Sequence, residues 1–232
     1  NYAALFNGGN VGIGTAAPGN PLTIVGTTFQ MSIEGYGTGA YGTIDLASAK
    51  GTLASPANID AADAILGRIR FVGREGNFYS GAEIVGYTTK SWGSSDWPTY
   101  LTFKTVPDGG TSPLERLRID AEGNVGIGNS ALETWKTTNV ALQVGGDAAL
   151  SAVKTQAAGN DFFISRNAYL DQTNTRWEYM STNADDEAER IVMANGTYSF
   201  DLTGTAGADD AAITFTTALL LDGNSRISLS NN

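Results

Sequence analysis

The six-residue stretch GNVGIG occurs at Gly9–Gly14 and again at Gly123–Gly128, and its pattern is unusual for a β-strand. Valine and isoleucine alternate as they do on a buried face, whereas the positions between and after them are glycines. Glycine weakens the interior of a strand because it loses the most backbone freedom on folding and offers no side chain to pack. The same unfavourable pattern at two distant sites therefore requires a structural explanation.

The sequence around the two motifs is also repeated. Each motif is followed by a strand-like pattern, LTIVG at Leu22–Gly26 and LQVGG at Leu142–Gly146. Two further pairs of blocks match, namely Tyr100–Thr105 with Ala212–Thr217, and Leu117–Gly128 with Leu219–Ser230. Because a repeat in sequence indicates a repeated structural unit, we expect two tandem β-rich units, residues 1–118 and residues 119–232, each opening with GNVGIG.

Short segments of alternating apolar and polar residues, bounded by Gly, Asn, Asp or Pro, predict an all-β fold of short antiparallel strands. The predicted strands are Leu22–Val25, Gly67–Val72, Ala82–Tyr87, Tyr100–Lys104, Leu114–Ile119, Phe162–Ser165, Ile191–Met193, Thr197–Leu202 and Ala212–Phe215. Residues that tolerate positive φ predict turns at Asp120–Asn124 and Leu221–Asn224. The one helical possibility is Ile59–Leu66, where Asp60 or Asp63 could cap a short turn.

The composition argues against several classes of function. The net charge of -10 and the calculated pI of about 4.4 do not suit a nucleic-acid-binding protein, which needs a basic surface. Without histidine or cysteine, the chain has no imidazole or thiol for nucleophilic catalysis or zinc binding. The longest nearly apolar run, Ala211–Leu221, is too short to span a bilayer. Because Asn1 is not an initiator methionine, we expect a processed chain or a part of a longer polypeptide.

The two sides of each GNVGIG motif differ in what can cover them. Along a strand the valine and isoleucine point to one side, and two of the glycines point to the other. The bare glycine side has to be filled by another backbone or by a bulky side chain. We therefore predict an interface between copies of the chain around a common axis, and the alternative is a β-bulge or tight corner inside a monomeric sandwich. The interface candidates are Val11, Gly12, Ile13, Gly14, Val125, Gly126, Ile127 and Gly128.

Two segments resemble a known family. Glu115–Asn129 and the looser Leu5–Gly26 resemble the GNVGIGT-x-x-P-x-x-x-L-x-V-x-G modules of phage tail fibres and related virion fibre proteins, and Leu101–Asp120 looks like the strand that leads into such a module. The second copy departs from the module because it has no proline after its glycines, and the echo at Asp222–Ser230 has lost the glycines altogether.

This resemblance implies a homotrimer whose strands intertwine or stack along a common axis. It places the protein on the virion surface, outside the cell, with other virion proteins and a host cell-surface glycan as further partners. Family members often carry a self-cleaving C-terminal chaperone, and since none follows Asn232, we expect that it was removed or never present. The leading hypothesis is a structural fibre or spike protein that supports or makes host attachment. The alternatives are a capsid decoration or extracellular filament shaft without receptor binding, and a polysaccharide depolymerase.

Carboxylates and aromatic rings are the remaining candidates for chemistry. Glycosidases need two carboxyl groups at a suitable separation, and the same groups can hold Ca²⁺. The acidic candidates are Asp60 with Asp63, the group Asp185, Asp186, Glu187 and Glu189, and Asp209 with Asp210. Solvated surface charge is the ordinary explanation for each, so we expect no catalytic residue, no metal site, no cofactor and no enzymatic activity. Aromatic residues in polar surroundings either stack on sugars or pack in a core. The candidates for glycan contact are Tyr36, Tyr41, Trp92, Trp97 and Trp177.

Overall fold

A computed structural model describes residues 9–24, 44–52, 55–155, 161–181, 186–224 and 226–229. These residues form β-strands, turns and irregular segments and contain no helix, so the predicted all-β fold is confirmed. No helix in this part of the chain is long and apolar enough to cross a membrane. The chain divides into two compact units, Asn1–Asp45 and Leu46–Asn232. The division between residues 118 and 119, which the repeats suggested, stays a prediction.

In the first unit, the motif forms the strand β1 (Val11–Ile13), which pairs in parallel with β2 (Leu22–Ile24). Val11 lies opposite Leu22 in this pair, and its backbone N–H donates a hydrogen bond to the carbonyl of Pro21 at 2.7 Å. The predicted strand at Leu22–Val25 is therefore confirmed up to Ile24, while Val25 lies outside the described residues.

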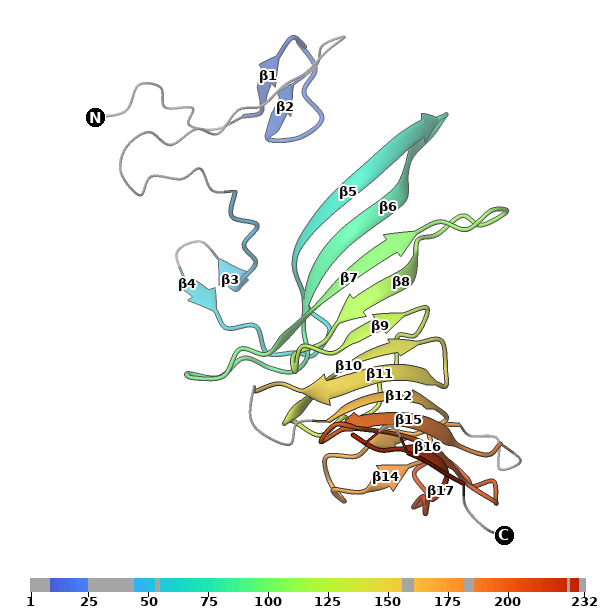
Figure 1. The fold of residues 1–232 in the computed structure, drawn as a ribbon. Coiled ribbons are helices and arrows are strands. Elements are labelled where there is room, and N and C mark those ends of the chain that lie inside the picture. The colour runs from blue at the N-terminus through green and yellow to red at the C-terminus, as the bar shows by residue number, and fades with distance from the viewer. Residues whose placement is uncertain are drawn as a thin grey trace, which may run out of the picture. The chain divides into compact units, whose positions relative to one another are not determined.

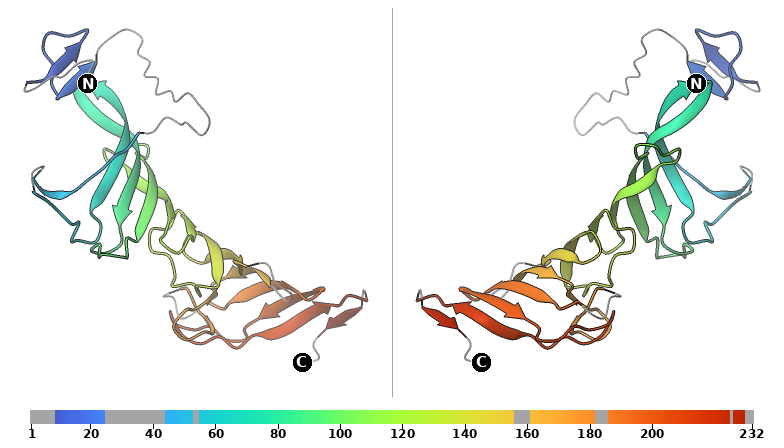
Figure 2. Two further views of the ribbon diagram at one scale, coloured as in Figure 1. Left: turned by 90° about the vertical axis from the view of Figure 1, so that its left-hand side faces the viewer. Right: turned by 90° about the vertical axis from the view of Figure 1, so that its right-hand side faces the viewer.

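The second unit is built around one twelve-stranded sheet, which Figures 1 and 2 show as a twisted succession of strands from β5 to β18. Every neighbouring pair in this sheet is antiparallel except β9 and β10, which are parallel. The strands of the sheet are β5 (Ile65–Glu75), β6 (Asn77–Thr88), β7 (Thr99–Thr105), β8 (Leu114–Ile119), β9 (Val125–Ile127), β10 (Asn139–Val144), β11 (Ala148–Val153), β12 (Phe162–Arg166), β15 (Glu189–Ala194), β16 (Thr197–Leu202), β17 (Thr216–Leu221) and β18 (Ile227–Leu229).

Two short antiparallel pairs lie outside the large sheet. The first joins β3 (Lys50–Thr52) to β4 (Ser55–Ala57), and the second joins β13 (Tyr169–Leu170) to β14 (Trp177–Glu178). The second pair belongs to the connection between β12 and β15, so these strands interrupt the succession in sequence without entering the sheet.

Most predicted strands are present, and two of them, β8 and β16, have the predicted bounds. The prediction of a strand at Ala212–Phe215 is wrong, because β17 begins at Thr216 and Ala212 forms only an isolated bridge to Glu178. Ile213 and Phe215 pack instead against a buried cluster that contains Tyr179. The alternation of apolar and polar residues in this segment therefore results from packing against the buried cluster, and the segment is not a strand of the sheet.

The helical possibility at Ile59–Leu66 is also wrong. The backbone turns at Asp63, which has a positive φ of 57°, and β5 begins at Ile65. The buried hydroxyl of Thr88 donates to the carbonyl of Ala61 at 2.7 Å and accepts from the N–H of Ala64 at 3.0 Å. These bonds satisfy backbone groups that a helix would otherwise pair, so the turn competes successfully with a helix.

The predicted turn at Asp120–Asn124 is confirmed. Gly123 has a φ of 89°, and the Asp120 carboxylate accepts hydrogen bonds from the N–H groups of Glu122 and Asn124 at 3.0 and 2.7 Å. Asp222 has the same role between β17 and β18, where its carboxylate accepts hydrogen bonds from the N–H groups of Asn224 and Arg226. Both of these matching blocks of sequence therefore contain a turn in which an aspartate side chain accepts backbone hydrogen bonds.

The glycines of the second motif allow a loop of the same chain to lie over β9. A Cβ added to Gly126 would be 2.6 Å from Cδ2 of Leu132 and 2.7 Å from the carbonyl oxygen of Asn129, so a larger residue would force the loop to shift. Gly128 has a positive φ of 69°, which turns the chain into that loop. In the first motif a Cβ on Gly12 would overlap the carbonyl oxygen of Thr15. The glycines therefore leave space for the loop that follows each motif. This loop leads to the next strand, which pairs in parallel with the motif.

Candidate interaction surface

The register of the large sheet places apolar side chains together on one face. Residues that are paired across neighbouring strands point to the same side. Ile127 of β9 pairs with Leu117 of β8 and with Val144 of β10. On the same side, Leu142 continues to Leu150 of β11. Apolar residues therefore face the same way across four consecutive strands.

The same face stays apolar across the other strands of the sheet. Leu117 pairs with Phe103, which pairs with Ile84, which in turn pairs with Ile69 of the edge strand β5. We call this surface the open face. Its large apolar members are Ile69, Phe71, Ile84, Leu101, Phe103, Leu117, Ile119, Val125, Ile127, Leu142, Val144, Leu150, Phe162, Ile164, Ile191, Met193, Tyr198, Phe200, Leu219, Leu221, Ile227 and Leu229.

None of these side chains is buried within the chain. Ile127 is 42% exposed and Val144 is 41% exposed, although both lie in the middle of the sheet. Soluble monomers rarely expose a continuous apolar patch of more than a few hundred Å². An apolar layer that crosses twelve strands is therefore a candidate for contact with another protein surface.

The opposite side of the sheet, which we call the covered face, is largely buried in the middle of the sheet although it carries polar residues. Gln143, between Leu142 and Val144 in sequence, is only 1% exposed, and its side-chain oxygen accepts a hydrogen bond from the N–H of Glu133. Thr102 and Ser151 are buried on the same side. The segments that connect the strands form this cover, and their residues Trp135, Tyr169 and Met180 pack in one core cluster with Ala141 of β10 and Ala149 of β11.

An ion pair and aromatic rings complete the covered face near the C-terminal strands. Arg190 pairs with the buried Asp201 at 2.8 Å, and its guanidinium lies 4.1 Å from the ring centre of Phe215 and 4.8 Å from that of Trp177. The Trp177 ring also packs edge-on against Phe163 at 4.9 Å. Trp177 therefore makes several contacts inside the protein.

The predicted interface residues divide into two groups. Val125 and Ile127 lie on the open face, whereas Gly126 is buried under the loop that contains Leu132. In the first unit Ile13 is 54% exposed, and Gly12 meets the loop at Thr15. The glycine side is thus filled from within the chain, and the valine and isoleucine side is the one left free. Whether any of these residues contacts another copy stays a prediction.

The predicted glycan-contact residues do not form one site. Trp92 and Trp97 share the loop between β6 and β7, where the Trp97 indole donates to the carbonyl of Gly93 at 2.8 Å and the ring is exposed. Trp177 lies on the separate strand β14. Tyr36 and Tyr41 lie outside the described residues.

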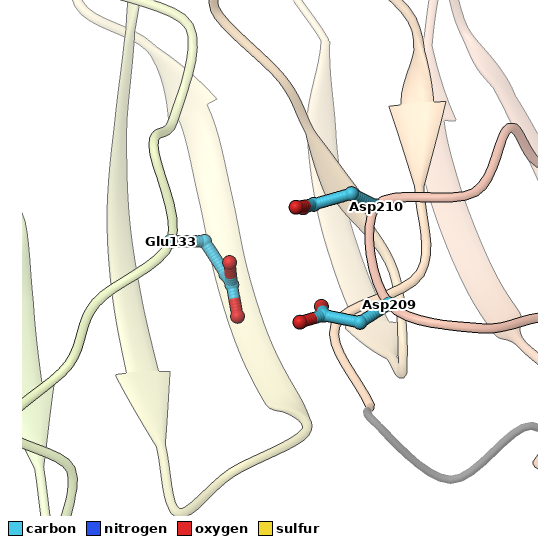
Figure 3. A group of neighbouring side chains, drawn as sticks. All are labelled: Glu133, Asp209 and Asp210. Carbon is cyan, nitrogen blue, oxygen red and sulfur yellow. The ribbon is translucent and has the colours of Figure 1, made fainter.

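A cluster of three carboxylates joins two distant segments (Figure 3). Oxygen atoms of Glu133, Asp209 and Asp210 lie within 4.8 Å of one another, an arrangement that suits a cation. Burial, reinforced by the charges of the two aspartates, raises the pKa of Glu133 to about 7. Asp210 also accepts a hydrogen bond from the Tyr169 hydroxyl at 2.7 Å. The sequence singled out Asp209 and Asp210 as a pair but gave no sign of Glu133, which is far away along the chain.

The other acidic groups have different surroundings. Asp63 accepts a hydrogen bond from the Tyr100 hydroxyl at 2.6 Å, and Asp186 and Glu189 both pair with Arg166. Glu187 is exposed, and Asp185 lies outside the described residues. In the part of the chain that the structure describes, the group around Glu133 is therefore the one acidic cluster suited to a metal ion.

Comparison with known proteins identifies the fold but not a family by sequence. No protein-family model and no curated protein matches the chain. The solved structure of the carboxy-terminal domain of the bacteriophage T5 L-shaped tail fibre, with its intramolecular chaperone domain, aligns with a TM-score of 0.54 and 9% identity. The alignment covers 88% of this chain and 63% of that one, so the chain spans less than two thirds of its length. A second structure of the T5 domain aligns with a TM-score of 0.49 and 10% identity over 88% of this chain and 91% of that one. The first alignment shows that the chain has a fold like that of a phage tail-fibre domain.

Proposed function

We propose that the chain is a structural fibre or spike protein of a virus particle and that it assembles as a homotrimer through the open face. The observation that carries this proposal is the inverted burial of the sheet, whose apolar side is open while its polar side is covered. Burying an isoleucine or phenylalanine side chain contributes about 1.5 to 3 kcal/mol. An interface of many such residues would therefore be strong and permanent.

The choice of three copies rests on the fold and on the GNVGIG resemblance. Two open faces could cover each other as a sandwich, whereas three could enclose a common apolar interior around an axis. The tail-fibre-like fold and the resemblance of Glu115–Asn129 to virion fibre modules favour the second arrangement. Three chains would carry 3 × (-10) = -30 charges, which would keep the assemblies apart in solution.

The proposed location is the virion surface, where the protein contacts other virion proteins and supports or makes attachment to the host. Three copies on one axis would raise avidity through repeated weak contacts. A shaft without receptor binding is the second candidate, since the aromatic rings of Trp135, Tyr169 and Tyr179 are buried in the chain. We propose no enzymatic activity.

The test of assembly is the mass of the purified chain in solution, measured by native mass spectrometry and light scattering. We expect three times 24.2 kDa for the unchanged chain. Ile127→Asp would place a charge in the middle of the open face, and Phe200→Asp would do so on another strand, so each should give monomers. Ser228→Asp is the matched control, because Ser228 is exposed on the other side of the edge strand β18. An unchanged chain that is a stable monomer would overturn the proposal.

A further inference from the structure

The edge strand β18 repeats the arrangement of β9. β9 pairs with β8 across a turn in which the N–H of Asp120 donates to the carbonyl of Asn124 at 2.9 Å. β18 pairs with β17 across a turn of the same length, in which the N–H of Asp222 donates to the carbonyl of Arg226 at 3.1 Å. In both hairpins the three residues before the aspartate pair with the three residues after the turn. β18 is therefore a third copy of the strand that β1 and β9 form.

The other two copies each have a parallel neighbour. β1 pairs in parallel with β2, and β9 with β10. At the start of β1 the N–H of Val11 donates to the carbonyl of Pro21 at 2.7 Å, and at the end of β9 the carbonyl of Ile127 accepts from the N–H of Gly145 at 2.9 Å. Among the residues that the structure describes, no strand pairs with the outer side of β18, which ends the sheet.

The backbone of β18 directs polar groups toward that outer side. Successive residues of a strand direct their N–H and C=O groups to opposite neighbours. Because the carbonyl of Arg226 is bound to Asp222, the groups of Ile227 and Leu229 point away from β17. These two residues correspond to Val11 and Ile127, whose backbones bind a parallel neighbour in the other copies. A strand edge of this kind is a template for pairing with another chain.

Ser228 indicates that the neighbour of β18 does not arrive as it does in the other copies. The middle residue of β1 is Gly12 and that of β9 is Gly126, and a Cβ on either would meet the loop that leads into the parallel strand. Ser228 occupies the corresponding position in β18. A loop of the same course would meet its side chain. A parallel neighbour therefore needs another route, which a separate polypeptide provides.

The strands β2 and β10 show which chemistry the neighbour should have. β2 has the sequence Leu-Thr-Ile and β10 ends in Leu-Gln-Val, so both place two apolar residues around a polar one. The apolar residues lie beside those of the motif in each register. Ile227 and Leu229 are 70% and 72% exposed, and apolar neighbours of the same spacing would cover part of this surface.

We propose that β18 accepts a parallel strand from another polypeptide, in which two apolar residues flank a polar one. Main-chain hydrogen bonds would supply the affinity, and the alternation of side chains would select the partner. The site is the edge of the sheet, so it is distinct from the open face through which copies of the chain are proposed to assemble. It joins the fibre to a different protein and extends the sheet by one strand.

Binding is tested on the full chain with a peptide that has the sequence of Val140–Gly146, VALQVGG, with both ends blocked. The readout is the amide hydrogen exchange of Ile227 and Leu229, measured by NMR. We expect both amides to exchange more slowly with the peptide present. Ile227→Pro removes the N–H that faces the partner and should abolish the effect, whereas the matched control Ile227→Val keeps that N–H and should retain it.

Two N-methylated peptides test the direction of the added strand. The N–H of Gly145 faces β9, so by alternation the N–H of Gln143 faces β9 as well and that of Val144 faces away. Methylation of the peptide nitrogen at the Gln143 position should therefore weaken binding about tenfold, through a lost hydrogen bond and a clash. Methylation at the Val144 position should change little. The reverse order would mean an antiparallel partner and would overturn the proposal.

A more sensitive form of the test joins the same segment to Asn232 through a Gly-Ser linker of about ten residues, which raises its local concentration. Unchanged exchange at Ile227 and Leu229 in both forms would refute the proposal. Slow exchange in the unchanged chain without any added segment would also refute it, because a neighbouring copy would then already cover the edge. Each result is independent of the mass in solution that tests assembly through the open face.

Discussion

The two faces of the twelve-stranded sheet differ in which kind of residue the chain covers. On the covered face, polar residues such as Gln143 and Ser151 are buried beneath connecting segments, whereas on the open face apolar residues such as Ile127 and Val144 remain accessible. In a self-sufficient monomer the apolar side of a sheet is the one that its own chain covers. The difference indicates that connecting segments of this chain cover the polar side of the sheet, while its most apolar layer is left open to another surface.

The largest loss of folding stability is expected from breaking the ion pair between Arg190 and Asp201 on the covered face. Arg190→Leu should destabilise the chain by about 3 to 5 kcal/mol, because it leaves the buried Asp201 without its cation. Urea unfolding measures the loss. Lys90→Leu is the matched control, since its pair with Asp96 is exposed and should contribute much less. Equal losses in the two variants would mean that the covered face does not depend on this pair.

A smaller loss of stability is expected from substituting Gly126, where the loop that contains Leu132 lies over β9. Gly126→Ala should cost about 1 to 3 kcal/mol, because its Cβ would displace Leu132 and the Asn129 carbonyl. Gly146→Ala is the control, because an added Cβ there meets nothing within 4 Å. Thermal unfolding of both variants compares the two glycines. If Gly126→Ala is as stable as the control, the glycines of the motif serve something other than this crossing.

The smallest change in stability is expected from Glu133, in the cluster that it forms with Asp209 and Asp210. Folding raises the pKa of Glu133 to about 7 from an ordinary value of 4.5, so its contribution to stability is fully present below pH 4.5 and is lost as the pH rises to 7. Glu133→Gln should therefore stabilise the chain at pH 8 by about 1 kcal/mol, a value discounted for the partial exposure of the carboxyl. It should change little at pH 4.

The pH dependence of unfolding for the unchanged chain and the variant is the measurement for Glu133. A loss of stability in Glu133→Gln at pH 8 would show that the charged carboxylate is stabilising, as it would be with a bound cation. Adding Ca²⁺ to the unchanged chain at that pH distinguishes a cation from a proton as the partner of the cluster.

Local patterns in the sequence predicted much of the fold. The alternation in Leu114–Ile119 and Thr197–Leu202 reproduced the bounds of β8 and β16, and the turn at Gly123 followed from residue types that tolerate positive φ. Alternation failed at Ala212–Phe215, because packing against Tyr179 produces the same period as a strand. Period alone does not distinguish these two causes.

The open face was harder to predict, because alternation shows that a strand has two faces without showing which one the chain covers. The glycines of the motif indicated a close approach correctly, but the approaching group is a loop only a few residues away. Glu133 joins Asp209 and Asp210 through tertiary packing alone. Contacts between residues so distant in sequence leave no periodic signal in a single chain.

The order of strands in the large sheet has a consequence for how the protein folds. From β5 to β18 each strand lies beside the one that precedes it in the sheet-forming sequence, and only the β13–β14 pair is set aside. In such a sheet each strand pairs with the strand before it, so most new strands close a short loop and lose little chain entropy. The sheet can therefore grow strand by strand in the order in which a ribosome delivers the chain.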